Sequence, residues 1–126
     1  MELVKVLSET RLEAMKQDDC VFCKIAAKEI PTVIIGESSH SLAFRDISPL
    51  APVHLLVISK DHYKNVTELT ATAPDVLADM MQLATHEALQ YTDGSFRLQF
   101  NTGSSAGQTV FHVHLHVLSD TPKGGS

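Results

Sequence analysis

The amino-acid sequence predicts an α+β fold in which a five-stranded antiparallel sheet packs against one long helix, with short helices beside it. Five short segments have the β-branched or alternating residues of strands, whereas a single long segment has apolar residues at three- and four-residue steps. They follow one another as three strands, the helix and two strands, an order that favours an antiparallel sheet with helix on one side. With 126 residues and 44% hydrophobic content, the chain can bury one sizeable core.

The first three strands are separated by residues that interrupt a strand. Gly36 and the polar residues 37–39 are expected to end the first strand and to form the turn of a hairpin. Pro49 and Pro52 require a loop before the third strand, because proline lacks the N–H that a strand ladder needs. The predicted strands comprise residues 33–35, 41–46 and 54–58.

The long helix is expected over residues 73–91. Thr72 is a candidate N-cap, Pro74 is tolerated in the first turn, and Asp75 completes a Thr-x-x-Asp capping pattern. The apolar positions share one helical face, which predicts that this face packs on the sheet. They are Val76, Leu77, Met80, Leu83, Ala84 and Ala88.

The last two strands follow the Asp93-Gly94 turn, at residues 96–100 and 109–118, with a loop rich in glycine and serine between them. Residues 20–119 therefore form the single predicted domain. It is preceded by an accessory segment, 1–19, and followed by a flexible tail, 120–126. A helix is expected in the first segment, where apolar residues lie at roughly helical spacing: Leu7, Leu12 and Met15.

Charge and hydropathy limit the classes of function. The net charge of -5 and the lack of a Lys/Arg run argue against general nucleic-acid binding, which needs a basic surface to replace counterions. No apolar stretch approaches the roughly 18 residues that span a bilayer, so we expect no membrane association. The first residues lack the pattern of a secretory signal, and we expect a cytoplasmic protein.

Three alternate histidines mark the final predicted strand. His112, His114 and His116 should emerge on one side of it, because successive strand side chains point to opposite faces. Two alternatives stay open: each histidine is an ordinary polar strand residue, or the three together ligate a metal ion, since neutral imidazole suits zinc or copper. Val110 should share the histidine side, and the opposite, core side should comprise Phe111, Val113, Leu115 and Val117.

Three blocks of sequence resemble the histidine triad family, in its nucleotide-binding, phosphoramidase-type branch. The blocks are CVFCKIAAKEIP (20–31), LAFRDISPLAPVHLLVISKDHYKNVTEL (42–69) and NTGSSAGQTVFHVHLHVLS (101–119). The resemblance implies hydrolysis or transfer of purine mononucleotides such as AMP or an adenosine phosphoramidate. It also implies a homodimer with a continuous ten-stranded sheet. The chain departs from many relatives after the triad, where Val117-Leu118-Ser119-Asp120 replaces a Gly-Gly or Pro-x-Arg segment.

The resemblance also implies roles for individual residues. His114 matches the nucleophile, which must be neutral and would be held by a hydrogen bond from Nδ1–H to a backbone carbonyl. Thr109 replaces the more usual serine, and its methyl group narrows the leaving-group pocket. The implied catalytic residues are His54, Thr109, His112, His114 and His116. The implied nucleotide-binding residues are Phe22, Asp46, Ile47, Asn101, Gly107, Gln108, Thr109, His114 and His116.

Cys20 and Cys23 supply half of a tetrahedral zinc site, which some members of the family complete with His62 and His112. Zinc would then brace the N-terminal segment against the sheet in a structural role. The alternative is a redox pair, although such a pair usually follows a strand directly. Two other functions stay open for the chain: a zinc-bearing interaction module, or a nucleotide-binding regulator with little turnover.

Overall fold

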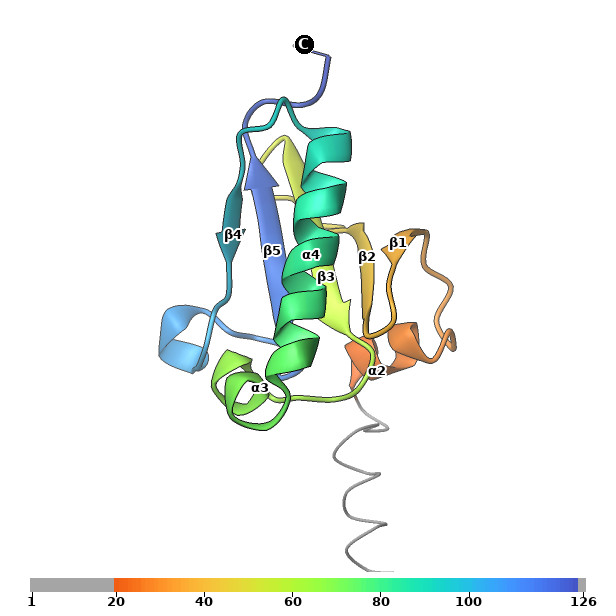
Figure 1. The fold of residues 1–126 in the computed structure, drawn as a ribbon, viewed down its shortest axis with the longest axis vertical. Coiled ribbons are helices and arrows are strands. Elements are labelled where there is room, and N and C mark those ends of the chain that lie inside the picture. The colour runs from red at the N-terminus through yellow and green to blue at the C-terminus, as the bar shows by residue number, and fades with distance from the viewer. Residues whose placement is uncertain (1–19, 125–126) are drawn as a thin grey trace, which may run out of the picture.

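The computed structural model describes residues 20–124, so the helix expected within residues 1–19 lies outside the described residues. A five-stranded antiparallel sheet has the order β1-β2-β3-β5-β4, and the long helix α4 lies along one of its faces (Figure 1). The predicted α+β class with five strands and a long helix is therefore confirmed. The elements are α2 (Val21–Ala26), β1 (Ile34–Glu37), β2 (Ser41–Arg45), β3 (Val53–Ser59), α3 (Val66–Thr72), α4 (Pro74–Tyr91), β4 (Arg97–Gln99), the 3-10 turn η1 (Ser104–Ala106) and β5 (His114–Ser119).

The sheet separates two hydrophobic clusters. The cluster beneath α4 contains alternate residues of the central strands, such as Leu55 and Leu115, together with the apolar stripe of the helix. The cluster on the other face contains the remaining alternate residues, such as Leu56, and residues of the short helix α2. Strand β3 is buried along its whole length because both of its faces are covered. This explains its almost continuous apolar sequence.

Helix α4 begins one residue later than expected and without the predicted cap. Thr72 belongs to the preceding helix α3, where its hydroxyl donates a hydrogen bond to the carbonyl oxygen of Glu68 at 2.8 Å. Ala73 is the N-cap of α4 and makes no side-chain capping bond. The Thr72–Asp75 capping prediction is therefore wrong, because α3 already uses the threonine. Pro74 does occupy the first turn, as predicted.

Gly36 lies inside β1 and does not end it. The pairing of β1 with β2 shifts in register between Ile34 and Gly36, so the strand continues through an irregularity. A Cβ atom at position 36 would lie 2.7 Å from Cδ of Glu87, whose side chain is almost fully buried in α4. Glycine is thus required by the close approach of the helix side chain, and the prediction that it terminates the strand is wrong.

Asp79 attaches α4 to the hairpin formed by β1 and β2. Its carboxylate accepts hydrogen bonds from the hydroxyl groups of Ser38 and Ser41, the latter at 2.7 Å. Burial raises the pKa of Asp79, but the two hydroxyl hydrogen bonds lower it and leave it below its usual value. The hairpin is consequently held against the helix by a charged acceptor.

The final strand is shorter than its sequence pattern suggested. β5 begins at His114, whereas residues 109–113 run outside the sheet and the N–H of Val113 donates to the carbonyl oxygen of Tyr63 at 2.7 Å. The prediction of one strand from 109 to 118 is wrong at its start, because this segment bends toward the loop after β3. Phe111, expected on the core side, is 40% exposed, whereas Val110 does pack with the cluster that includes α2.

The segment after β5 lies against the turn that follows α4. The N–H of Asp93 donates to Thr121, and the N–H of Lys123 donates to Tyr91, in both cases to the carbonyl oxygen at 3.0 Å. None of the helices in residues 20–124 combines the length and the hydropathy that a membrane-spanning segment requires.

Candidate active site and metal centre

The histidines of β3 and β5 meet on the sheet face opposite α4. The antiparallel register pairs Leu56 with His116 and His54 with Leu118, so His54 lies diagonally beside His116. Nε2 of His54 is 2.9 Å from Nδ1 of His116, and the ring of His114 lies 5.0 Å from that of His116. The predicted site residues His54, His114 and His116 therefore lie together, and we call them the histidine cluster.

His114 has the hydrogen bond expected of a nucleophile. Its Nδ1 is 2.8 Å from the carbonyl oxygen of His112, and only an N–H can bond to that acceptor. The neutral ring then has an unprotonated Nε2. Burial lowers the pKa of His114, against the opposing effects of its bond to His112 and of the charge of Asp46. The imidazole is consequently neutral near pH 7 and able to act as a nucleophile.

His54 and His116 are neutral for the same main reason. Burial lowers the pKa of His116 to about 4, with further lowering by His114 and His54 and an opposing effect of Asp46. Burial also lowers the pKa of His54, while the charge of Asp46 raises it. The cluster therefore presents three uncharged imidazoles and one carboxylate.

The carboxylate of Asp46 lies at the edge of this cluster. One oxygen, Oδ1, accepts the N–H of Ser48 at 2.7 Å, and the other, Oδ2, is 3.5 Å from Nε2 of His54. Ile47 is next to it and is 98% exposed, so its side chain is available for contact with a ligand. Phe22 is buried instead and packs edge-on against His114 at a centroid distance of 5.1 Å.

The loop before β5 is braced by Gln108. Its side-chain amide donates to the carbonyl oxygens of Lys64 and Val110, and its oxygen accepts the N–H of Gly103 at 2.9 Å. Asn101 closes the same loop by donating to the carbonyl oxygen of Ala106 at 2.8 Å.

Gly107 and Thr109 form the part of this loop nearest the histidine segment. Gly107 has a φ of 90°, in the left-handed region that favours glycine. Thr109 is exposed. Contacts of these two residues, and of Asn101 and Gln108, with a nucleotide stay predictions.

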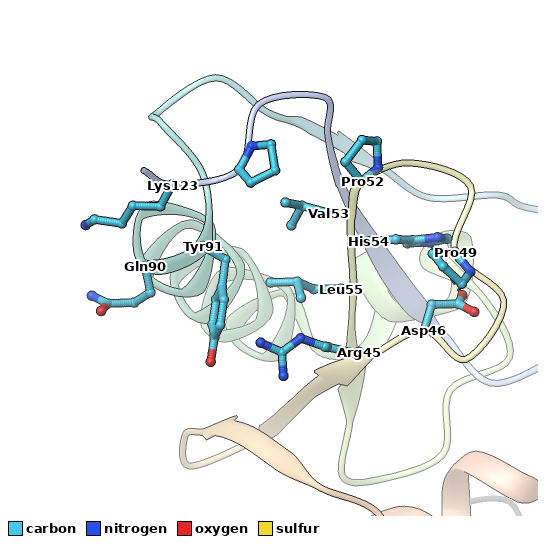
Figure 2. A pocket seen from close by; sticks show the side chains of 11 residues that line it. Arg45, Asp46, Pro49, Pro52, Val53, His54, Leu55, Gln90, Tyr91 and Lys123 are labelled. Atoms are coloured by element: carbon cyan, nitrogen blue, oxygen red, sulfur yellow. Dashed lines mark ion pairs between the residues drawn. The ribbon is translucent and has the colours of Figure 1, made fainter. Parts of the chain in front are cut away.

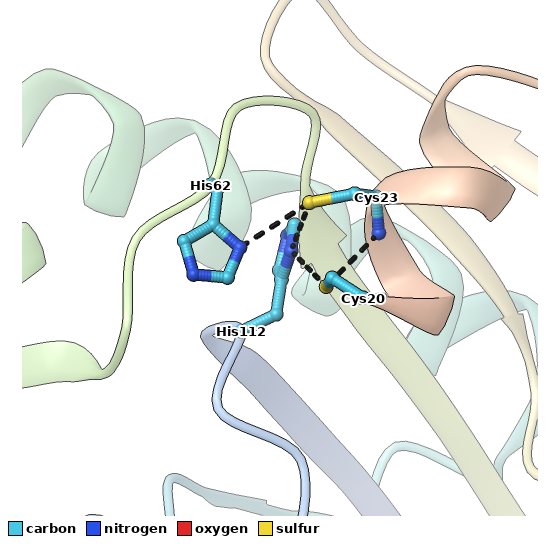
Figure 3. Close-up of side chains that lie close together, drawn as sticks. All are labelled: Cys20, Cys23, His62 and His112. Carbon is cyan, nitrogen blue, oxygen red and sulfur yellow. Dashed lines mark hydrogen bonds between the residues drawn. The ribbon is translucent and has the colours of Figure 1, made fainter. Parts of the chain in front are cut away.

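The predicted metal ligands form a second buried cluster (Figure 3). Cys20, Cys23, His62 and His112 each offer one ligand atom, and these atoms lie within 4.8 Å of one another. Nδ1 of His112 is 3.3 Å from both sulfur atoms, and Nδ1 of His62 is 3.2 Å from Sγ of Cys23. Two thiols and two imidazoles are a donor set that zinc prefers.

The surroundings of His112 suit a metal ligand. Its Nε2 is 2.7 Å from the carbonyl oxygen of Ser59, so the proton lies on Nε2 and the lone pair of Nδ1 faces the two sulfur atoms. Burial lowers the pKa of His112 to about 4. The cluster could therefore hold a metal ion such as zinc.

The alternative in which the three triad histidines share one metal ion does not agree with the geometry. His112 precedes β5 and turns its ring toward the cysteines, whereas His116 groups with Asp46 and His54. Cys20 is the N-cap of α2, and the residues before it lie outside the described residues, so the redox-pair alternative stays open.

A cavity of about 450 Å³ lies beside His54 and Asp46, at the C-terminal end of α4 (Figure 2). Arg45 reaches across it, with its guanidinium 4.8 Å from the centre of the Tyr91 ring. His54 and Asp46 contribute to its wall, yet their side chains extend away from Tyr91 in the view of Figure 2. The cavity is therefore adjacent to the reactive groups without containing them.

Two contributors to the site have no signal in the sequence. The N–H of Leu50 donates to Nδ1 of His54 at 3.0 Å, and the carbonyl oxygen of Ser59 accepts from His112. Both act through backbone atoms, which every residue type carries.

Comparison with known proteins agrees with this geometry. The HIT domain model matches residues 27–123, and the chain belongs to the HIT family. Protein HitA of Neisseria gonorrhoeae is 42% identical over 103 residues, which cover 80% of this chain and 95% of HitA. The purine nucleoside phosphoramidase of Escherichia coli K12 is 36% identical over 109 residues, covering 85% and 92% of the two chains. A HIT family hydrolase from Clostridium thermocellum superimposes with a TM-score of 0.78 and 40% identity, covering 88% and 98%.

The lowered pKa of His116 predicts a pH-dependent stability. The folded protein binds this proton only near pH 4, whereas the unfolded chain binds it near the ordinary value of 6.5. The unfolded state therefore holds more protons between these values, and the free energy of unfolding should fall as the pH is lowered from 6.5 to 4. Urea unfolding across this range should show a shallower dependence for His116→Gln.

The exposed His86 provides a matched control for this experiment. His86→Gln should retain the pH dependence of the parent, because this substitution leaves both the histidine cluster and the cysteine–histidine cluster unchanged. Equal slopes for the parent and His116→Gln would show that His116 is protonated at similar pH in the folded and unfolded states.

Proposed function

We propose that the protein hydrolyses purine nucleoside phosphoramidates, with AMP as the nucleotide product and His114 as the nucleophile. The observation that carries this proposal is the hydrogen bond from Nδ1 of His114 to the carbonyl oxygen of His112 at 2.8 Å. It leaves an unprotonated Nε2 on a buried, neutral ring with His116 alongside. The 36% identity with a purine nucleoside phosphoramidase supports the reaction class.

The reaction proceeds in two displacements. Nε2 of His114 forms a bond to the α-phosphorus while the phosphorus–nitrogen bond breaks, and the leaving amine takes up a proton from solvent water. A water molecule then attacks the same phosphorus and loses a proton to solvent while the bond to Nε2 of His114 breaks, which releases AMP and the neutral imidazole. His116 stabilises the charge on the phosphoryl oxygens, and His54 holds His116 in place through the 2.9 Å contact between their rings. His112 acts through its carbonyl oxygen, which orients His114.

The nucleotide binds along the same face. The carboxylate oxygens of Asp46 can accept further hydrogen bonds, which suits the two ribose hydroxyl groups. The exposed side chain of Ile47 and the ring of Phe22 border the base. The loop residues border the phosphate and the leaving group, where the methyl group of Thr109 narrows the space. They are Asn101, Gly107, Gln108 and Thr109.

We also propose that the cysteine–histidine cluster binds one zinc ion in a structural role. Cys20 and Cys23 are buried beside His62 and His112, and the four ligand atoms lie within 4.8 Å of one another, close enough to surround a single small cation. Zinc would stabilise the attachment of α2 to the sheet. A cytoplasmic location, where cysteines stay reduced, agrees with this role.

A homodimer through α4 and β4 is the third proposal. β4 lies at the edge of the sheet and pairs only with β5 among the described strands. Met81 and Leu89 are large apolar side chains on the outer surface of α4, 38% and 55% exposed. Pairing of two β4 edges would give a ten-stranded sheet and would cover these side chains.

Replacing His114 should abolish turnover while nucleotide binding persists. In a direct assay of AMP release from adenosine 5′-phosphoramidate, His114→Asn should be slower by at least about a thousandfold, because the nucleophile is lost. The exposed His40 offers a control, and His40→Asn should keep the parent rate. Binding of AMP without turnover by the parent would instead favour a nucleotide-binding regulator.

Zinc binding predicts a defined metal content. The purified parent should hold about one zinc ion per chain after dialysis, measured by mass spectrometry of the metal. His62→Gln should lose most of the zinc and unfold at lower temperature, whereas the exposed variant His86→Gln should keep it. The proposal is wrong if the parent holds no zinc under reducing conditions or if His62→Gln keeps the full amount.

The dimer predicts a mass of two chains at micromolar concentration in light scattering. Leu89→Glu should shift the protein to monomer, because a charge would be buried at the interface. Val33, 79% exposed and preceding β1, provides the control variant Val33→Glu, which should stay dimeric. A monomer mass for the parent would refute the proposed interface.

A further inference from the structure

The loop between β2 and β3 is folded back on the histidine cluster by its own hydrogen bonds. Oδ1 of Asp46 accepts the N–H of Ser48 at 2.7 Å, and the N–H of Leu50 donates to Nδ1 of His54 at 3.0 Å. The side chain of Leu50 is 81% exposed. Its contribution to the site is therefore its backbone N–H and not its packing.

This backbone bond fixes where His54 carries its proton. A neutral imidazole that accepts a hydrogen bond at Nδ1 has its single proton on Nε2. Nε2 of His54 lies 2.9 Å from Nδ1 of His116, a normal hydrogen-bond distance, and 3.5 Å from Oδ2 of Asp46. The proton of His54 is therefore directed to His116, whose Nδ1 must be the acceptor.

The same reasoning fixes the proton of His116. Because its Nδ1 accepts, the neutral ring of His116 carries its proton on Nε2. His114 has the reverse arrangement, since its Nδ1–H donates to the carbonyl oxygen of His112. Two rings whose centres are 5.0 Å apart thus present opposite groups: a lone pair on His114 and an N–H on His116.

We propose that the backbone N–H of Leu50 is a positioning group for the reaction, which sets the tautomer of His54 and thereby makes His116 a hydrogen-bond donor. The direction of each bond follows from the one before it, from the loop to His54 and from His54 to His116. The assignment of protons stands on the hydrogen bonds alone. That the donor faces a phosphoryl oxygen rests on the proposed function.

Proline and alanine at position 50 separate the backbone from the side chain. Leu50→Pro removes the N–H, whereas Leu50→Ala keeps it and removes a side chain that is already exposed. The measurement is the ¹⁵N chemical shift of the imidazole nitrogens in the full chain labelled at histidine, which distinguishes protonated from unprotonated nitrogens. The rate of AMP release from adenosine 5′-phosphoramidate is measured on the same samples.

The parent and Leu50→Ala should show protons on Nε2 of His54, Nε2 of His116 and Nδ1 of His114. Leu50→Pro should show mixed tautomers of His54 and His116, with His114 unchanged. Its kcat should fall by about a hundredfold, because the donor is misplaced, while KM changes little. Equal kcat values for Leu50→Pro and Leu50→Ala would overturn the proposal.

The melting temperatures of Leu50→Pro and Leu50→Ala show whether the proline variant folds. If it does not fold, the tautomers measured in the parent test the proposal. A proton on Nδ1 of His54 or of His116 in the parent would overturn the proposal. An unchanged His54 tautomer in folded Leu50→Pro would also overturn it and would assign the control to Asp46. If the tautomers are as expected but no phosphoramidate is hydrolysed, the proposed function fails and the proton assignment holds.

Discussion

The antiparallel pairing of β3 with β5 is the constraint on which the rest of the structure depends. Its register pairs Leu56 with His116 and Ile58 with His114, and side-chain alternation places His54 on the same face. The opposite face of the same two strands supplies the apolar layer beneath α4. A slip of one residue would exchange these faces, so the hydrophobic core itself fixes the position of the reactive histidines.

His112 connects the two functional clusters because it uses its ring and its backbone differently. The ring lies between Ser59 and the two cysteines, while the carbonyl oxygen accepts the Nδ1–H of His114. Phe22 adds a second connection, since it lies between the cysteines in sequence and packs edge-on against the rings of both His112 and His114. The candidate metal centre and the candidate nucleophile are thus parts of one packed unit.

The errors of the sequence interpretation share a cause. Thr72 has the pattern of a cap, but a helix that ends at Thr72 already uses it. Gly36 has the pattern of a strand end, but the approach of Glu87 from α4 explains the glycine within the strand. The alternating residues before His114 resemble a strand, but their backbone bonds to the loop after β3. In each case a local pattern was correct for an isolated segment, and a partner distant in sequence decided the outcome.

By itself, the sequence determined the features that repeat along one element: the alternate histidines, the apolar stripe of α4, the spacing of the two cysteines and the order of strands and helix. Periodicity carries this information because it depends only on the geometry of a single strand or helix. Only the tertiary structure decided which atoms meet, including the division of the three histidines between two clusters and the bond from Leu50 to His54. The physical reason is that backbone N–H and carbonyl groups are the same in every residue, so their partners are set by the path of the chain and leave no mark in the sequence.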